Sequence, residues 1–349
     1  MTRLIKTIRG AKASLLSLFS HKESLVLLGL FGLAFVNWGD NVLRGQTYEF
    51  IVLGLMAVSL LLGDAVLSIL GIYLSCWFAY LMWAGFYGAI PAEILFQSLD
   101  TMTFIFAGMG VYVLVRRGRM PTERFMNWIC GLTVAFCLLA LTQMGLFKMD
   151  PVATLGNRNF FAAWLAIAMP LFFGKRWLWF IPLIVICLLC AKTSTAIAAA
   201  LMATAFYLWG WKGAGLAVIP GVAYYLVFKL PVHNLSLGTR LEYWTDALSK
   251  MANSWQTILF GVGPGVYWRW GNEFHSEFVY ILFNLGIVGL MIMAAYTFRS
   301  FRKPCDRKLQ AAFLAALIDS FGNHVMHVAL TALLTIVILA LKDRTEGAT

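Results

Sequence analysis

The chain has 349 residues, of which 61% are hydrophobic and 12% are charged, and its formal net charge is +11. Because soluble domains carry roughly 25% charged residues, this composition excludes a large soluble core. The hydrophobic residues form several runs of about 18 or more, which indicates membrane-spanning helices. The basic residues are interspersed between these runs. The positive charge is therefore attributed to membrane orientation, and nucleic acid is rejected as a partner.

These runs predict an all-α polytopic membrane protein with about 12 transmembrane helices, in a single membrane domain that covers residues 1–349. The basic segment from Met1 to Lys22 lacks a following small-residue cleavage site, which favours a cytoplasmic lead-in over a signal peptide. The spans are expected at residues 24–38, 48–63, 65–85, 99–115, 125–147, 159–173, 177–191, 193–209, 213–229, 276–298, 309–322 and 324–341.

Twelve spans place both termini on one side, and the distribution of basic residues predicts that this side is cytoplasmic. The segment 230–275 between spans nine and ten is then a long periplasmic loop. Eight of the 27 lysine and arginine residues fall on the periplasmic side, which normally disfavours them: Arg44, Lys148, Arg158, Lys192, Lys229, Arg240, Lys250 and Arg269.

The periplasmic loop contains a predicted amphipathic helix, which should rest on the bilayer surface or on the spans beneath it. Arg240 lies one turn before Trp244, at the edge of the apolar stripe, where it can point into a cavity. The alternative is a solvated arginine. The stripe recurs at steps of four and three residues and consists of Leu237, Leu241, Trp244, Leu248, Met251 and Trp255.

Two further cationic positions lie between predicted spans. Arg158, flanked by Asn157 and Asn159, falls at the start of a helix, where backbone N–H groups and a guanidinium fork both suit phosphate. The alternative for Arg158 is an interfacial arginine that reaches lipid headgroups. Lys192 lies between two apolar runs and is a functional candidate if it lies within the membrane, but it is merely interfacial if the chain turns there.

A glycine-rich segment follows the predicted loop helix. The alternating glycines Gly261, Gly263 and Gly265 are able to present backbone N–H groups to a phosphate, although a tight turn is the favoured interpretation. The segment lacks the lysine and the Ser/Thr of a nucleotide-binding loop.

His275, at the mouth of span ten, is the candidate general base, because histidine titrates near neutral pH. Glu273 and Glu277 are candidates to orient it, although residues two positions apart on a helix do not face each other. His324 and His327 are expected to hydrogen-bond inside the bundle, with Asp319 one turn before Asn323.

The six cysteines form no metal-type pair, and neither HExxH nor GxSxG is present. We therefore predict no metal and no other cofactor.

Three of these segments resemble the O-antigen ligase and polymerase superfamily. The run Gly156-Asn157-Arg158-Asn159-Phe160-Phe161-Ala162-Ala163-Trp164-Leu165 is similar to its GNxN-F-A-x-x-L segment. The residues Arg240, Trp244 and Ala247 are similar to its R-x-x-x-W-x-x-A loop helix. The segments Phe260–Gly265, His275–Phe278 and Leu285–Leu290 are similar to the C-terminal part of the family pattern, GxGxG…HNEY…E-x-GI-x-GL. Arg158 stands where proline is more usual, Lys192–Thr195 where Ser-Arg-Gly is frequent, and Asn284 where an acidic residue is frequent.

The resemblance implies a membrane glycosyltransferase of the GT-C type in the bacterial inner membrane, with its active site facing the periplasm. The donor is a glycan on undecaprenyl diphosphate, and the acceptor is a lipid A–core sugar or another glycan. The reaction is metal-independent and inverting. His275 is the implied base, and Arg158, Arg240 and Lys192 bind the diphosphate. The supporting residues are Asn157, Asn159, Trp244, Gly263, Gly265 and Glu277.

Three alternatives to a ligase stay open on these residues. The first is an O-antigen polymerase of the same superfamily, in which the acceptor is another lipid-linked glycan. The second is a transporter or carrier, in which the same cations bind an anionic lipid-linked substrate but no bond is made. The third is a catalytically weakened, regulatory relative, which the departures from the family motifs suggest. The large one-sided loop with its histidine favours an enzyme.

Overall fold

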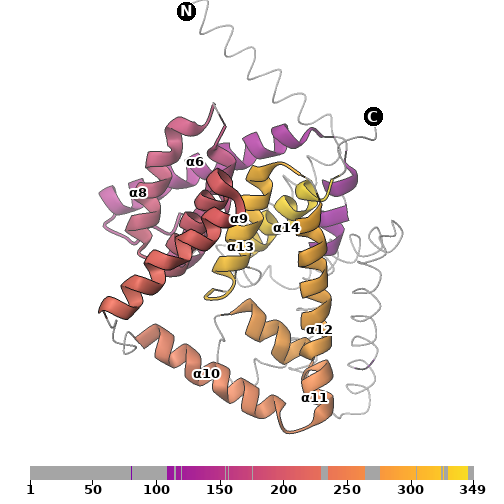
Figure 1. Ribbon diagram of the computed structural model, residues 1–349. Helices are drawn as coiled ribbons and strands as arrows, with labels where there is room; N and C mark the ends of the chain where they lie inside the picture. Colours follow the sequence, from indigo (N-terminus) through magenta and orange to yellow (C-terminus); the bar gives the residue numbers. More distant parts are fainter. Residues whose placement is uncertain are drawn as a thin grey trace, which may run out of the picture.

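The computed structural model shows a bundle of helices with a further layer of helices below it (Figure 1). It describes residues 80, 108–113, 115–118, 120–153, 155, 157–174, 176–228, 235–263, 276–303, 305–323, 325 and 329–344. Apart from residue 80 and the stretch from 108 onward, the first four predicted spans lie outside the described residues.

The described part of the chain is all-helical, with no strand. Each span predicted from residue 125 onward corresponds to a helix or to half of one. The elements are α6 (Thr122–Leu146), α7 (Arg158–Ala168), η1 (Met169–Phe172), η2 (Leu178–Phe180), α8 (Ile181–Ala191), α9 (Ser194–Phe228), α10 (Leu235–Met251), α11 (Trp255–Phe260), α12 (Glu277–Arg302), α13 (Arg307–Asp319) and α14 (Ala329–Lys342).

Among the described residues, three helical stretches are long and apolar enough to cross a membrane: Thr122–Leu146, Ser194–Val218 and Glu277–Arg302. Three shorter apolar stretches accompany them: Arg158–Phe172, Leu178–Ala191 and Thr331–Lys342. The all-α membrane class is therefore supported, whereas the count of about 12 spans stays a prediction.

Helix α7 is the centre of the bundle. Phe161 through Ala168 are fully buried, because α6, α8, α9, α13 and α14 all pack around this helix. The indole N–H of Trp164 donates to Thr133 Oγ1 of α6 at 2.9 Å, so the one polar atom of this core ring is satisfied. At 11 residues, α7 is about 16 Å long, and even with η1 it is shorter than an ordinary span.

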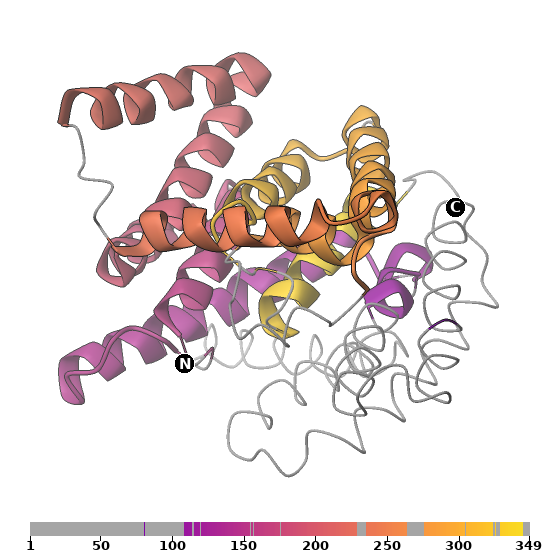
Figure 2. The ribbon, with the colours of Figure 1, turned by 90° about the horizontal axis from the view of Figure 1, so that it is seen from below.

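Glycines break two of the long helices. Gly210 has φ 67° and ψ −152°, and it divides α9 into halves that match the separate spans predicted at 193–209 and 213–229. The two halves run in different directions (Figure 2). Gly286 has φ 68° and ψ −171° and interrupts α12 in the same way, where a single span was predicted. Both conformations favour glycine because they are strained for a residue with a Cβ.

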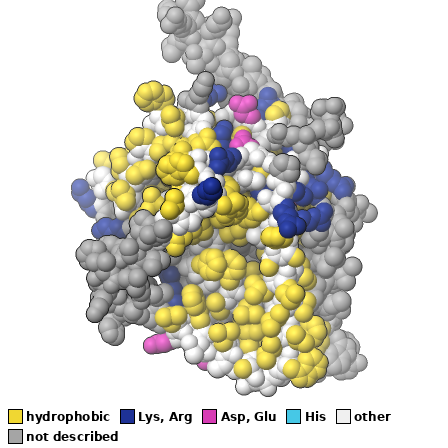
Figure 3. Space-filling model, viewed as in Figure 1, with side chains coloured by type: hydrophobic (Ala, Val, Ile, Leu, Met, Phe, Trp, Pro, Cys, Tyr) yellow, Lys and Arg dark blue, Asp and Glu magenta, His cyan; other side chains and the backbone are white. Residues whose placement is uncertain are grey.

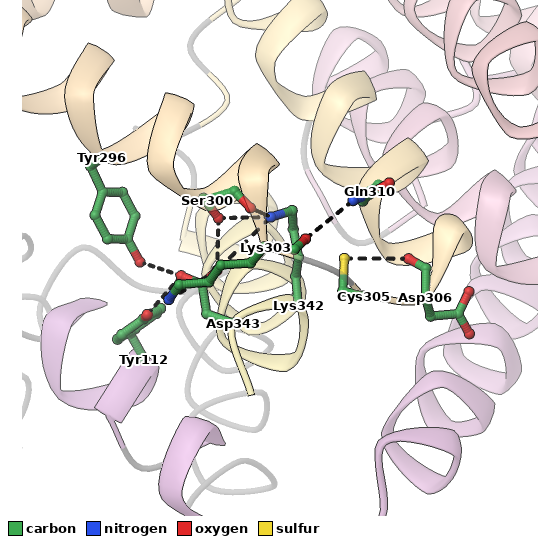
Figure 4. A network of polar contacts seen from close by, with 9 residues as sticks. All are labelled: Tyr112, Tyr296, Ser300, Lys303, Cys305, Asp306, Gln310, Lys342 and Asp343. Carbon is green, nitrogen blue, oxygen red and sulfur yellow. Dashed lines mark hydrogen bonds and ion pairs between the residues drawn. The ribbon is translucent and has the colours of Figure 1, made fainter. Parts of the chain in front are cut away.

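The two ends of the bundle carry different chemistry. At one end, Asp343 after α14 is buried and accepts hydrogen bonds from Tyr112 Oη, Tyr296 Oη and Ser300 Oγ, each at 2.8 Å (Figure 4). Lys342 Nζ donates to Ser300 Oγ at 2.9 Å. These bonds join the last turns of α12 and α14 to the helical segment that contains Tyr112, and they satisfy the buried carboxylate. The candidate site lies at the opposite end of α12.

Candidate anion-binding site

The first predicted cation begins the central helix. Arg158 is the first residue of α7, as the sequence predicted, and it is exposed. Asn157 caps this helix, because its Oδ1 accepts the backbone N–H of Asn159 at 2.8 Å. The cap fixes the N-terminus of α7, and the guanidinium of Arg158 is therefore carried on the most deeply packed helix of the described structure.

The second predicted cation, Lys192, lies at the same end of the bundle. The chain turns at this residue between α8 and α9, and Lys192 adopts a left-handed backbone with φ 55° and an exposed side chain. The next residue, Thr193, bonds through its hydroxyl to Asn159 Oδ1 at 3.1 Å. This bond ties the α8–α9 turn to the N-terminus of α7. Lys192 is therefore a residue of the turn, and the interpretation as a lysine deep within a span is wrong.

The third predicted cation is half-buried. Arg240, on α10, lies against the turn that follows α13: a methyl group on Gly322 would approach its Nη1 to 3.3 Å and Thr195 Cγ2 to 2.3 Å. The absence of a side chain at Gly322 therefore makes room for both neighbours. Burial lowers the pKa of the Arg240 guanidinium, and the negative charge of Asp319 partly offsets this effect. The alternative of a fully solvated arginine is wrong.

A buried carboxyl group lies beside Arg240. Asp319, the last residue of α13, is fully buried, and its Oδ1 accepts from Asn323 Nδ2 at 2.8 Å. The same amide donates to Thr195 Oγ1 at 2.9 Å, which connects α9 to this turn. Oδ2 of Asp319 makes no hydrogen bond to the described part of the chain. Arg240 likewise makes no hydrogen bond to the described residues, so its N–H donors are candidates to bind a ligand.

Asp319 is the functional candidate that the sequence did not single out. Its one signal was its position one turn before Asn323, at the end of a predicted span. A carboxyl group is expensive to bury unless it is paired, and such a residue inside a membrane bundle is a functional candidate by default. What the sequence lacked was the contact between α10 and the α13 turn, because these elements lie far apart along the chain.

Helix α10 is confirmed, but its packed face differs from the predicted stripe. Ala247 and Met251 are buried against Tyr280 and Phe283 of α12, with Trp244 partly buried beside them. This packing holds Arg240 toward the bundle, since Arg240, Trp244, Ala247 and Met251 follow each other at helical spacing. Three members of the predicted stripe are instead exposed: Leu241 (44%), Leu248 (47%) and Trp255 (63%), the last of which begins the separate helix α11.

The chain bends within the glycine segment, and the role of this segment as a phosphate cradle is not supported at the described residues. The backbone N–H of Val262 donates to Phe283 O at 2.9 Å, and that of Gly263 donates to Asn284 O at 3.0 Å. Both N–H groups are therefore occupied by α12. Gly261, at φ 81°, lies so close to α12 that a Cβ would meet Asn284 O at 2.3 Å. The chain bends at Val262, but Pro264 and the residues after it up to His275 lie outside the described residues, so the tight turn stays a prediction.

Several predicted residues lie outside the described residues: His275, Glu273, Gly265, His324 and His327. Glu277 is described, as the first residue of α12, and is buried. Its backbone N–H donates to Ser320 O at 2.9 Å, which brings the start of α12 beside the residue that follows Asp319. The structure thus brings together Arg240, Asp319 and the start of α12, and it places Arg158 and Lys192 together around Asn159 and Thr193.

Within the described ranges, no group of three or more His, Cys, Asp or Glu side chains could hold a metal ion. Compared with known proteins, the chain matches no family model and no curated protein. The arrangement itself is what remains to be explained: cations and the buried acidic residues Asp319 and Glu277 gather at one end of a helical bundle, beside the amphipathic helix α10.

Proposed function

We propose that this protein is a membrane glycosyltransferase of the O-antigen ligase type. It transfers a glycan from undecaprenyl diphosphate to a lipid A–core sugar or another glycan at the periplasmic face of the bacterial inner membrane. The observation that carries the proposal is the half-buried Arg240 beside the buried Asp319. A guanidinium that makes no hydrogen bond to the described residues and lies in a partly water-excluded site is suited to an anionic group such as a diphosphate.

The chemistry requires stabilisation of a leaving group. The acceptor hydroxyl oxygen attacks the anomeric carbon from the face opposite the diphosphate, the bond from that carbon to the diphosphate oxygen breaks, and the configuration inverts. Negative charge then develops on the diphosphate. Arg240 stabilises this charge more strongly in a partly buried site than in bulk water. Arg158 and Lys192, which share one end of the bundle, extend the cationic surface toward the remaining phosphate oxygens.

Asp319 has a positioning role in this scheme. Its negative charge acts on Arg240 and favours the charged form of the guanidinium, which burial opposes. Asn323 and Thr195 hold one carboxyl oxygen in place through the shared amide. A fixed carboxyl group beside a flexible arginine reduces the number of orientations that the guanidinium must lose when the diphosphate binds.

His275 is the proposed base that takes the proton from the acceptor hydroxyl. Two neighbouring residues in the sequence support this role: Ser276 and Glu277 are buried at the start of α12, beside Ser320. The proton released by the attacking hydroxyl needs an acceptor near the cationic site, and an imidazole is suited to that task at neutral pH.

The decisive experiment is reconstitution of the purified chain in lipid nanodiscs with an undecaprenyl-diphosphate-linked glycan. Separate reactions supply lipid A–core or only further donor, and the products are separated by mass. Transfer to lipid A–core supports the ligase, and chain extension without it identifies a polymerase, which uses the same chemistry on a different acceptor. Saturable donor binding without any product, in the presence of both acceptors, would favour a carrier and overturn the enzyme.

A further inference from the structure

The exposed surface of α10 is divided into an apolar side and a polar side. Leu241 and Leu248 are seven residues apart, so they lie on the same side of the helix, and they are 44% and 47% exposed. Glu242 and Ser249, also seven residues apart, are exposed on a different side. The packed face, with Ala247 and Met251, is a third side. If water surrounded the whole exposed surface of α10, nothing would favour leucines on one exposed side and polar residues on another.

The helix that follows α10 in the chain, α11, also exposes hydrophobic side chains. None of the six residues of this short helix is buried, and four of them are large and hydrophobic: Trp255 (63% exposed), Ile258 (36%), Leu259 (37%) and Phe260 (42%). Isolated exposed hydrophobic residues are ordinary on protein surfaces. Four on one six-residue helix exceed isolated exposure and mark α11, together with the leucine side of α10, as a candidate contact surface.

The same surface is continuous with a helix that qualifies as a membrane span. The backbone of Leu259 lies against Gly286, where an added Cβ would meet Leu259 O at 2.3 Å. The residues after Gly286 include the exposed Ile287 (38%) and Met291 (65%) of α12, which is long and apolar enough to cross a membrane. Hydrophobic side chains cover this part of the molecule (Figure 3). Lipid that contacts α12 therefore reaches α11 without crossing a polar boundary.

We infer that α10 and α11 are seated in the interfacial region of the bilayer. The surface formed by Leu241, Leu248, Trp255, Ile258, Leu259 and Phe260 contacts phospholipid acyl chains, and the side with Glu242 and Ser249 faces water. Tryptophan at the edge of such a surface is typical of membrane interfaces, where its amphipathic ring is favoured. The same seating places Arg240, one residue from Leu241, at the border between lipid and the bundle.

This inference does not depend on whether a glycosidic bond is made. It assigns a lipid-contacting face to the loop helices, and a carrier of a lipid-linked anion would use it equally. It also explains why α10 keeps two leucines, Leu241 and Leu248, 44% and 47% exposed on one side of the helix. A lipid-linked substrate that moves within the leaflet would meet this surface first.

The test uses photocrosslinking in the full-length protein. The amino acid p-benzoylphenylalanine is placed at Leu248 or Ile258, with Ser249 and Glu242 as matched polar-side controls. Each variant is purified, reconstituted in nanodiscs of phosphatidylethanolamine and phosphatidylglycerol, irradiated and analysed by intact mass. We expect at least about fivefold more phospholipid adduct at Leu248 and Ile258 than at the controls, because acyl chains surround only the apolar side.

Two outcomes would overturn the inference. Equal lipid adducts at Leu248 and Ser249 would show that α10 has no lipid-facing side. Adducts at Leu248 and Ile258 that join two copies of the chain, in place of lipid adducts, would assign the surface to self-association. All four positions are exposed, so none of the substitutions removes a core contact, and monodisperse elution from a sizing column confirms that each variant is folded.

Discussion

Replacement of Arg240 by alanine tests the proposed site most directly. Arg240 is half-buried beside Gly322 and the charge of Asp319, and it makes no hydrogen bond to the described part of the chain. Its donors are the groups that we propose bind the diphosphate. A hydrogen bond to a charged group contributes about 1.5–3 kcal/mol, so Arg240→Ala should lower kcat/KM about 10- to 150-fold. The loss should be larger in kcat than in donor affinity if the contact strengthens as the leaving group departs.

Lys250 on the same helix is the matched control. Its Nζ pairs with Asp246 one turn earlier, and the two side chains are 31% and 45% exposed. Exposed pairs at this spacing contribute about 0.3–0.5 kcal/mol to stability, so Lys250→Ala should change the thermal midpoint little and turnover hardly at all. Both substitutions remove one positive charge from α10, and the difference between them isolates the position of the charge.

The assay measures transfer per folded molecule in nanodiscs, together with donor binding and the thermal midpoint of each variant. A double-mutant cycle with Asp319→Asn adds a second criterion, because neighbouring charges do not contribute additively. If Asp319 acts through Arg240, then Asp319→Asn should reduce turnover in the wild-type background and have little further effect in Arg240→Ala. Equal losses from Arg240→Ala and Lys250→Ala would refute the reasoning and reduce α10 to a generic basic surface.

Four further results are expected. His275→Ala should lower transfer about 10²- to 10⁴-fold while donor binding is retained, and an unchanged turnover would remove the proposed base. Arg158→Lys keeps the charge but loses the planar fork, so transfer should fall roughly tenfold, as measured in the same assay. Gly286→Ala should lower the thermal midpoint, because its backbone conformation costs about 1–3 kcal/mol for a residue with a Cβ and Leu259 O blocks the added carbon. Gly145→Ala in α6 is the control that should not lower it, because an added Cβ there meets nothing within 4 Å. Burial raises the pKa of the Cys305 thiol to about 11. Its alkylation rate, followed by peptide mass spectrometry, should therefore still rise about tenfold per pH unit between about pH 7 and 9. A plateau of the rate by about pH 8 would contradict this.

Hydropathy and helical spacing were sufficient for most helices of the described region, but not for the short helix α11 (Trp255–Phe260), whose first residue was assigned to the stripe of the loop helix. The predicted span at 125–147 corresponds to α6, and the pair 193–209 and 213–229 corresponds to the halves of α9 on either side of Gly210. These elements are encoded locally, because a long apolar run and a glycine act through the backbone of their own residues. The break of α12 at Gly286 was missed, since its cause is the approach of Leu259 from another helix.

The apolar stripe of α10 shows what spacing alone does not resolve. Hydrophobic periodicity placed Leu241, Trp244 and Leu248 on one stripe, yet the structure buries Trp244 partly against α12 and leaves both leucines exposed. In a soluble protein, apolar residues are attracted to one environment, the core. A helix at a membrane surface has two apolar environments, the bundle and the lipid, so a broad stripe is divided between them. The sequence pattern shows which residues are hydrophobic, but it does not distinguish those that face the bundle from those that face the lipid.

At its described residues, 261–263, the glycine segment contributes to the site by its position and not through backbone N–H groups that could bind phosphate. The N–H groups of Val262 and Gly263 donate hydrogen bonds to carbonyl groups of α12, so they cannot bind an anion at the same time. The same bonds fix the chain at Gly263 against Asn284, eight residues or about 12 Å along α12 from Ser276. Gly263 and Ser276, which flank the segment that carries the proposed base, therefore both lie at the first half of α12. Trp244 and Ala247 of α10 pack against the same half. Gly261 and Gly286 allow α11 to approach α12 closely enough for those hydrogen bonds to form. A substitution at either glycine should therefore disturb the proposed base by shifting Gly263, where the loop meets α12, and not by removing a contact to the diphosphate.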